Sequence, residues 1–294
     1  MRSLSFSIGS CLDGKNVRSA LYQNGVSRRL LIRLKNTENG IMLNGRPARV
    51  IDSVQKGDIV AIQIPQDTKP ALPQSVAVPV LYFDDDLIVL NKPPFMICHP
   101  SRNHQSGTLA HAFAAIIGQR GKAAAFRPLN RLDRDTSGVL IAALNSYAAA
   151  KLTGHIYKEY LAVCRGCLEG EGTIDLPISR VNDRSILREV STTGSPAVTH
   201  WRALASCPQA TLLRVWLETG RTHQIRVHFS YLGHSLIGDD FYGDPDPRIP
   251  RQALHCSMAR FFHPVTGKTE EVVAPLPGDM RTLLSSLGLP TEEI

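Results

Sequence analysis

The stretch RPLNRLDRDTSGVLIAAL, residues 127–144, joins a cluster of charged side chains to an apolar run and decides how the chain is interpreted. Its centre holds four charged residues, namely Arg131, Asp133, Arg134 and Asp135. The apolar run at 139–144 has the length of a buried strand, and Gly138 allows a sharp turn before it. A neighbouring cation favours the ionised form of a carboxylate, which can then act as nucleophile or base. Loops also use such groups for simple ion pairs, so these residues alone leave both interpretations open.

A second polar cluster lies at 217–243, in LETGRTHQIRVHFSYLGHSLIGDDFYG. The alternating run at 212–218 predicts a strand before it, and we expect a helix over 222–232. Arg221 then stands at the start of that helix, where anions bind well, as a candidate partner for a phosphate or for the carboxylate of Asp133. The three histidines of this cluster do not share one helical face with an acid, which favours core or surface positions over metal binding. They are His223, His228 and His234.

The other patterns mix helices and strands without a regular alternation, which favours an α+β fold. Residues 26–36 predict a short helix whose basic side chains gather together. These are Arg28, Arg29, Arg33 and Lys35. Asn44-Gly45 predicts a two-residue hairpin, since both positions tolerate positive φ. We also expect two strands around an acidic turn at 84–86, a helix over 107–118 that ends at Gly118, and a strand at 158–163 that Tyr160 leads into.

Charge and proline divide the chain into two parts. Residues 65–79 contain four prolines and predict a semi-rigid linker between a small domain at 1–64 and a large one at 80–294. The formal net charge is +7, and residues 1–64 carry ten lysines and arginines against four acidic residues. The remainder is nearly neutral, with 23 against 22. A basic small domain beside a neutral large one indicates a module that binds a polyanion.

The cysteines and the hydropathy of the sequence indicate the cellular compartment in which we expect the protein. The six cysteines are scattered and no export signal is evident, so we expect reduced thiols and a cytoplasmic protein. Cys164 and Cys167 form a C-x-x-C, but without a second such pair it supports neither a zinc ribbon nor a redox motif. No apolar run reaches the roughly 18 residues of a membrane span, and we expect no membrane partner.

These residues lead to a family resemblance. The segment NRLDRDTSG at 130–138 resembles the hallmark H-R-L-D-x-x-T-S-G of the RluA-type pseudouridine synthases. Further blocks of similarity follow in the family's order across 81–277: YFDDDLIVLNKP (82–93), HPSRNHQSGTL (99–109), KEYLAV (158–163), LETGRTHQIRVH (217–228), GHSLIGDDFYG (233–243), ALHCSMARFFHPVTGK (253–268) and APLP (274–277). Residues 1–64 resemble, more weakly, the small RNA-binding domain that many of these enzymes carry.

The resemblance implies a fold and a set of site residues. The fold is a mixed, largely antiparallel sheet flanked by helices, preceded by a small α/β RNA-binding domain. Asp133, Tyr160 and Arg221 match the catalytic aspartate, the active-site tyrosine and the arginine that pairs with the aspartate. The implied RNA contacts are Arg131, which matches an arginine that displaces the target nucleotide, together with Lys92 and the basic residues Arg28, Arg29, Arg33 and Lys35. Asn130 stands where the family usually has histidine.

The implied activity is isomerisation of uridine in ribosomal or transfer RNA by a monomer, with no metal or organic cofactor. The base must leave its stack, and a tyrosine can then stack on it. Asp133 could attack the nucleotide covalently or abstract a sugar proton to give a glycal, and the sequence leaves both routes open. The competing interpretations are a non-catalytic RNA-binding protein of the same fold and a hydrolase that uses the 131–138 loop.

Overall fold

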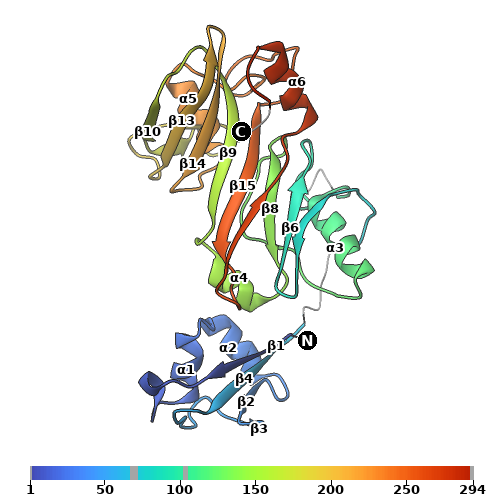
Figure 1. The fold of residues 1–294 in the computed structure, drawn as a ribbon, viewed down its shortest axis with the longest axis vertical. Helices are drawn as coiled ribbons and strands as arrows, with labels where there is room; N and C mark the ends of the chain where they lie inside the picture. The colour runs from blue at the N-terminus through green and yellow to red at the C-terminus, as the bar shows by residue number, and fades with distance from the viewer. Residues whose placement is uncertain (1, 67–71, 102–104, 292–294) are drawn as a thin grey trace.

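The computed structural model describes residues 2–66, 72–101 and 105–291. Part of the predicted linker (67–71) and part of the 99–109 block (102–104) lie outside the described residues. The predicted class is confirmed, because the described residues form two main, largely antiparallel sheets and a separate two-stranded one, with helices packed around them (Figure 1).

The N-terminal module, residues 2–64, is built on a small antiparallel sheet of order β1-β4-β2-β3. Its elements are β1 (Arg2–Ser7), the 3-10 turn η1 (Ser10–Leu12), α1 (Val17–Gln23), α2 (Arg28–Lys35), β2 (Ile41–Leu43), β3 (Arg46–Pro47) and β4 (Ile59–Ile64). The predicted hairpin is confirmed, with Asn44 at φ 50° and Gly45 at φ 80° between β2 and β3.

The predicted basic helix is α2. Ser27 caps it, because its hydroxyl accepts a hydrogen bond from the N–H of Leu30 at 3.2 Å. Leu30, Leu31 and Leu34 are buried in the core of the module. This apolar stripe leaves the basic residues on the remaining faces of the helix.

The large sheet follows the order β10-β13-β14-β9-β15-β8-β6-β5, with β16 beside β15 and β7 beside β8. Its strands are β5 (Val80–Phe83), β6 (Leu87–Lys92), β7 (Arg127–Pro128), β8 (Ser137–Ala143), β9 (Tyr157–Arg165), β10 (Glu171–Asp175), β13 (Val198–Cys207), β14 (Ala210–Leu217), β15 (Leu254–Phe262) and β16 (Thr269–Val273). All pairings are antiparallel except that of β8 with β15. Strand β8 is buried along its whole length, as its unbroken apolar run predicts.

Four helices and one separate hairpin complete this part of the chain. They are α3 (Leu109–Gln119), α4 (Ser146–Leu152), α5 (Gln224–Tyr231), α6 (Gly278–Ser286) and the strand pair β11 (Ile178–Arg180) and β12 (Arg188–Val190). Helix α3 passes through Gly118, and Gly121 at φ 66° follows its end, so the expected stop at Gly118 is wrong. Among the described residues, no helix combines the length and the apolar character needed to cross a bilayer.

The N-terminal module lies against the end of the large sheet that carries α4, while α5 and α6 lie at the opposite end (Figure 1). A bidentate ion pair joins the two parts: Arg2 donates to both carboxylate oxygens of the buried Asp86, at 3.0 and 2.7 Å. Asn145 donates to the same carboxylate at 2.8 Å. Tyr147 of α4 packs into the core of the module. Two charged groups and an aromatic ring therefore hold the module in a defined position.

Candidate active site

Asp133 lies in the loop that leads from β7 into the buried strand β8. The backbone carbonyl of Asp133 accepts a hydrogen bond from the N–H of Thr136 at 3.2 Å, which closes a turn just before the strand. The carboxylate side chain is 28% exposed. A rigid core strand thus positions an acid that solvent and a substrate can still reach.

Asn130 holds this loop against β8. Its amide oxygen accepts from the N–H of Ile141 at 2.9 Å, and its amide nitrogen donates to the carbonyl of Val139 at 3.0 Å. The residue is only 7% exposed. Asn130, which stands where the family usually has histidine, therefore binds the backbone of β8. Its amide supplies one donor and one acceptor for these two contacts.

Lys92, which we expected to contact RNA, is completely buried. Its ammonium group donates to the carbonyls of Pro93, Met96 and Arg134, at 2.8 to 2.9 Å. Burial lowers the pKa of Lys92 to about 8. Because Arg134 directly follows Asp133, Lys92 helps to hold the loop of the carboxylate.

The guanidinium group beside Asp133 belongs to Arg226 rather than to Arg221, which corrects the expected pairing. Arg226 lies in the first turn of α5, and its Nη1 is 3.5 Å from Oδ2 of Asp133. Its other nitrogens form a bidentate pair with the fully buried Asp239, at 2.7 Å each. The position of Arg226 is therefore set from behind by a second carboxylate, while one nitrogen remains for Asp133.

Arg221 is exposed and lies just before α5. Its Nε donates to the carbonyl of Pro196 at 2.9 Å, and its backbone N–H donates to the side-chain oxygen of Gln224, the first residue of the helix, at 2.9 Å. The side chain still lines the small cavity that contains Asp133. The position of each arginine relative to α5 explains which one pairs with Asp133. Arg226 lies within the first turn and faces the carboxylate, whereas Arg221 precedes the helix and lies at the edge of the cavity.

The cavity beside Asp133 measures about 60 Å³ and brings together several of the expected residues. Its polar and aromatic lining includes Arg131, Asp133, Tyr160, Arg221, His223 and Arg226. Tyr160 is 6% exposed, and burial raises the pKa of its hydroxyl well above the ordinary value. Arg131, by contrast, is exposed at the edge. The long-range contacts of the fold therefore gather the charged loop of 131–133, the tyrosine of β9 and the start of α5 at one point.

His223 is a site residue that sequence reasoning considered only as a possible metal ligand. Its Nε2 lies 3.9 Å from the carboxylate of Asp133, and its Nδ1 is 2.7 Å from the hydroxyl of Tyr242. Burial lowers the pKa of His223, while the charge of Asp133 opposes that shift. Its backbone is left-handed, with φ 58°, at the position just before α5. The signal available in the sequence was its place within the R-x-H-Q-x-R segment, between the two arginines.

The other two histidines of the cluster have separate partners. His228 lies between the hydroxyl of Thr199 and the carbonyl of Leu176, at 2.9 Å each. His234 contacts the carbonyl of Arg165 at 2.8 Å. The ring of His228 therefore joins α5 to β13, and the ring of His234 joins the segment after α5 to β9.

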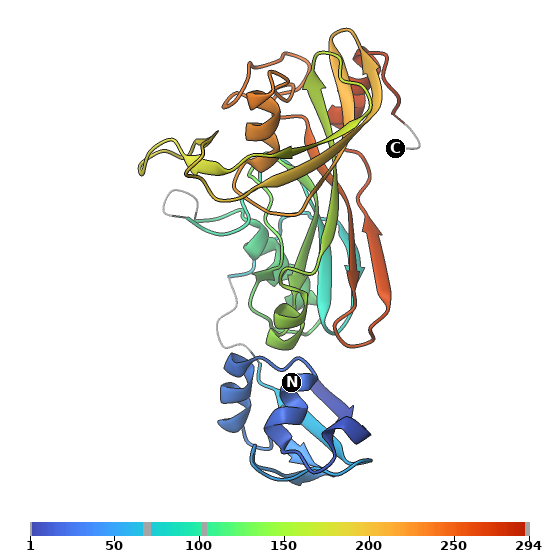
Figure 2. The ribbon, with the colours of Figure 1, turned by 90° about the vertical axis from the view of Figure 1, so that its left-hand side faces the viewer.

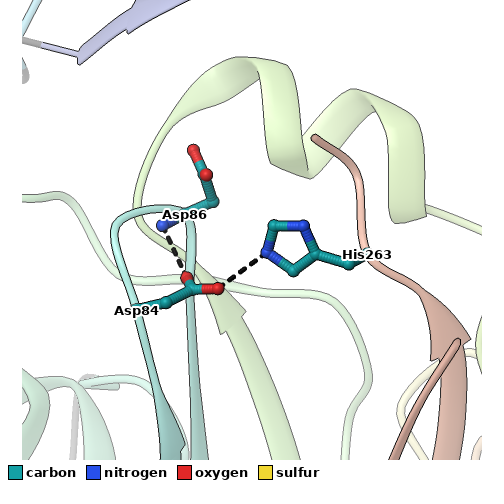
Figure 3. A group of neighbouring side chains, drawn as sticks. All are labelled: Asp84, Asp86 and His263. Carbon is teal, nitrogen blue, oxygen red and sulfur yellow. Dashed lines mark hydrogen bonds and ion pairs between the residues drawn. The ribbon is translucent and has the colours of Figure 1, made fainter. Parts of the chain in front are cut away.

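A separate group of potential metal ligands consists of Asp84, Asp86 and His263, whose ligand atoms lie within 4.8 Å of one another (Figure 3). The carboxylate of Asp84 accepts from His263, from the hydroxyl of Tyr82 and from the backbone N–H groups of Asp86 and Leu87, each at 2.7 Å. The carboxylate of Asp86 points away from His263 and is bound at the module interface described above. Protein donors thus occupy these oxygens, and the hydrogen bonds stabilise the turn between β5 and β6.

The basic residues of α2 lie apart from Asp133. Arg29 and Arg33 line a groove of about 930 Å³ between α2 and α4, together with Arg127 of β7. Arg28 and Lys35 are exposed on the module itself. The segment from Arg127 to Asp133 connects this groove with the cavity, because it runs back along β8.

The α+β scaffold thus presents one open carboxylate, with a buried arginine beside it and a tyrosine in the same cavity. Residues 86–231 match the family model of the RNA pseudouridylate synthases. The chain is 38% identical to an RNA pseudouridine synthase of Bacillus subtilis over 268 residues, which cover 88% of this chain and 95% of that protein. It is 36% identical to the ribosomal large subunit pseudouridine synthase D of Yersinia pestis over 279 residues, or 87% and 84% of the two chains.

Solved structures agree with this assignment. The human RNA pseudouridylate synthase domain containing 1 superposes with a TM-score of 0.55 at 26% identity, over 74% of this chain and 97% of that one. The fold of the human RNA pseudouridylate synthase domain containing 4 is also similar, with a TM-score of 0.59 at 22% identity over 72% and 93% of the chains. The chain belongs to the RNA pseudouridylate synthase family, and it is an RNA isomerase.

Proposed function

We propose that Asp133 is the catalytic carboxylate of this pseudouridine synthase. The observation that carries the proposal is the contact of a solvent-accessible Asp133 with Arg226, which Asp239 holds in place. Arg226 places a positive charge beside the carboxylate, and attack on the nucleotide or removal of a sugar proton is chemistry that a carboxylate anion performs. Both the covalent and the glycal route begin from this state.

The other residues of the cavity have complementary roles in the proposal. Tyr160 offers a ring on which the displaced uracil stacks, and the exposed Arg131 occupies the space that the uridine leaves in the RNA. Arg221, which we expected to pair with Asp133, instead acts at the entrance of the cavity. Arg226 takes the pairing role and joins Asp133 and Tyr160 as a proposed catalytic residue.

Replacement of Asp133 by asparagine tests the proposal. Asp133→Asn keeps the size of the side chain and removes the negative charge, so we expect pseudouridine formation to fall by at least ~10³-fold, as for the loss of a nucleophile or base. RNA affinity and the melting temperature should change little. Pseudouridine is measured by chemical mapping of RNA incubated with each protein, and activity equal to wild type would remove Asp133 from this role.

We further propose that the substrate is RNA of the large ribosomal subunit, modified by a monomer in the cytoplasm. The names of the relatives, such as synthase D of Yersinia pestis, support this choice over transfer RNA. Pseudouridine maps of total RNA from cells with and without the gene test it. Loss of sites confined to transfer RNA would overturn the ribosomal assignment.

The N-terminal module supplies RNA contacts in this proposal. Three of the basic residues of α2 are exposed and the fourth, Arg33, lines the groove beside α4. Phosphate contacts made by such residues contribute affinity without reading the base sequence. The domain limits of 1–64 and 80–294 stay part of the proposal.

A further inference from the structure

The β11–β12 hairpin is the yellow arm that projects from the body of the protein in Figure 2. Its register places Arg180 of β11 directly opposite Arg188 of β12. Residues opposite one another in an antiparallel pair point to the same face, and like charges there are destabilising. The hairpin thus carries an unfavourable pair of cations that an anion between them would relieve.

A third arginine meets this pair. A cavity of about 260 Å³ lies between the hairpin and the start of α5. Its lining includes three arginines, Arg180, Arg188 and Arg221, and the hydroxyl groups of Thr193, Ser195 and Thr222. Guanidinium and hydroxyl groups are donors that suit the oxygens of a phosphate. The composition of the cavity indicates an anionic ligand.

The positive charges of this cavity are not neutralised by the protein. Within the described part of the chain, no carboxylate oxygen lies within 4.0 Å of Arg180, Arg188 or Arg221. Their hydrogen bonds go to backbone carbonyls, for example at 2.9 Å from Arg188 to Ile186 and at 2.9 Å from Arg221 to Pro196. Carbonyls orient the guanidinium groups but leave their full charge available.

The cavity adjoins the proposed active site. Arg221 lines both this cavity and the one that contains Asp133. The hydroxyl of Tyr242 accepts from the backbone N–H of Arg188 at 2.8 Å and lies 2.7 Å from His223. His223 in turn lies 3.9 Å from Asp133. One tyrosine therefore connects the hairpin to the residue beside the carboxylate.

We propose that Arg180, Arg188 and Arg221 bind a backbone phosphate of the RNA next to the uridine that enters the cavity of Asp133. The identity of the polyanion rests on the proposed function, whereas the anion site rests on the hairpin geometry. When a base leaves its stack, its flanking phosphates remain outside the catalytic cavity and need a fixed position. Arginine suits this role because its planar fork matches two phosphate oxygens.

Equilibrium binding of a uridine-containing RNA stem–loop tests the proposal, with all substitutions made in an Asp133→Asn background so that no turnover interferes. Arg180→Gln and Arg188→Gln should each raise Kd roughly tenfold, the loss expected for a hydrogen bond between charged groups. The slope of log affinity against log salt should fall by about 0.7 to 0.9 for each arginine. Arg180→Lys, which retains the charge, should recover most of the slope.

Arg184→Gln is the matched control. Arg184 is an exposed arginine of the same hairpin that does not line the cavity, and its replacement should change Kd by less than about twofold. If Arg180→Gln and Arg188→Gln weaken binding no more than this control, the phosphate site is overturned. Circular dichroism of each variant confirms that the hairpin changes leave the fold intact.

Two further outcomes separate the alternatives. If inorganic phosphate raises the melting temperature of the wild type but not of Arg180→Gln, while both bind RNA equally, the cavity holds free phosphate and the RNA proposal is wrong. If the hairpin variants lose RNA affinity but the wild type forms no pseudouridine in ribosomal or transfer RNA, the phosphate site stands and the proposed function fails.

Discussion

At the scale of single residues, Arg221 and Arg226 have different surroundings although they stand close together in the chain. Arg226 is 3% exposed and lies between two carboxylates, whereas Arg221 is exposed and donates to a backbone carbonyl. Sequence reasoning left Arg221 a choice between a phosphate and Asp133. The structure assigns the carboxylate to Arg226, which leaves the phosphate as the proposed partner of Arg221.

His255 is a buried residue whose ionisation links stability to pH. The hydroxyl of Ser137 lies 2.9 Å from its Nδ1 and the carbonyl of Ala274 lies 3.3 Å from its Nε2. Because a carbonyl can only accept, Nε2 carries the proton and Nδ1 accepts from the serine in the neutral ring. Burial lowers the pKa of His255 to about 4, from an ordinary value of 6.5.

We therefore expect stability to fall as the pH drops from 6.5 towards 4. In this range the unfolded chain takes up a proton at His255 and the folded protein does not, which amounts to about 3 kcal/mol across the window. Urea unfolding at several pH values measures the effect. His255→Gln should be less stable overall but should lose less stability over the same window, and equal pH slopes for the two proteins would contradict the prediction.

At the scale of elements, the strand β8 connects the loop of Asp133 to the core through Gly138. This residue has φ 111°, and it pairs with Lys92 of β6 on one side and Cys256 of β15 on the other. A Cβ atom at this position would collide with the backbone carbonyl of Cys256. Glycine is therefore required both by the backbone conformation and by the close approach of β15.

Gly138→Ala should destabilise the protein by more than about 2 kcal/mol, because neither the strained φ nor the backbone of β15 can relax cheaply. Chemical unfolding measures the change in the free energy of unfolding. Gly118→Ala provides the control: Gly118 lies inside α3 with nothing within 4 Å of its added Cβ, so alanine should stabilise the helix by about 0.5–1 kcal/mol. Similar effects at both positions would show that the approach of β15 is unimportant.

At the scale of the whole molecule, the RNA contacts that we propose for the N-terminal module depend on its position. The Arg2–Asp86 ion pair and the burial of Tyr147 hold α2 beside α4, so the basic groove and the Asp133 cavity lie along one path over β8. Substitutions on α2 test the module better than its deletion, since deletion would leave Asp86 buried without its arginine.

The combined variant Arg28→Gln, Arg29→Gln and Lys35→Gln should weaken RNA binding and lower the salt slope by about 2, at roughly 0.7 to 0.9 per lost phosphate contact. Filter binding of an RNA stem–loop between low and moderate salt measures the slope. Arg46→Gln, an exposed change on β3 of the same module, should leave it nearly unchanged. An unaltered slope in the combined variant would mean that α2 does not contact RNA.

Local patterns in the sequence were sufficient to predict many of the helices and strands. The apolar run after Gly138 predicted the buried strand β8, Asn44-Gly45 predicted the hairpin of the module, and the segment 26–36 predicted α2. The same local reasoning located the charged loop of Asp133 directly before a core strand. These features depend on backbone preferences and on side-chain periodicity within a few residues, which the sequence contains by itself.

Only the tertiary structure decided which groups meet across the chain. Arg226 and Asp133 are 93 residues apart, Lys92 is sealed beneath the Arg134 carbonyl, and the opposition of Arg180 to Arg188 follows from a strand register. Such contacts depend on how helices and strands pack and on which side chains burial removes from water. A basic residue looks the same in sequence whether packing turns it toward a carboxylate, into the core or out to a phosphate.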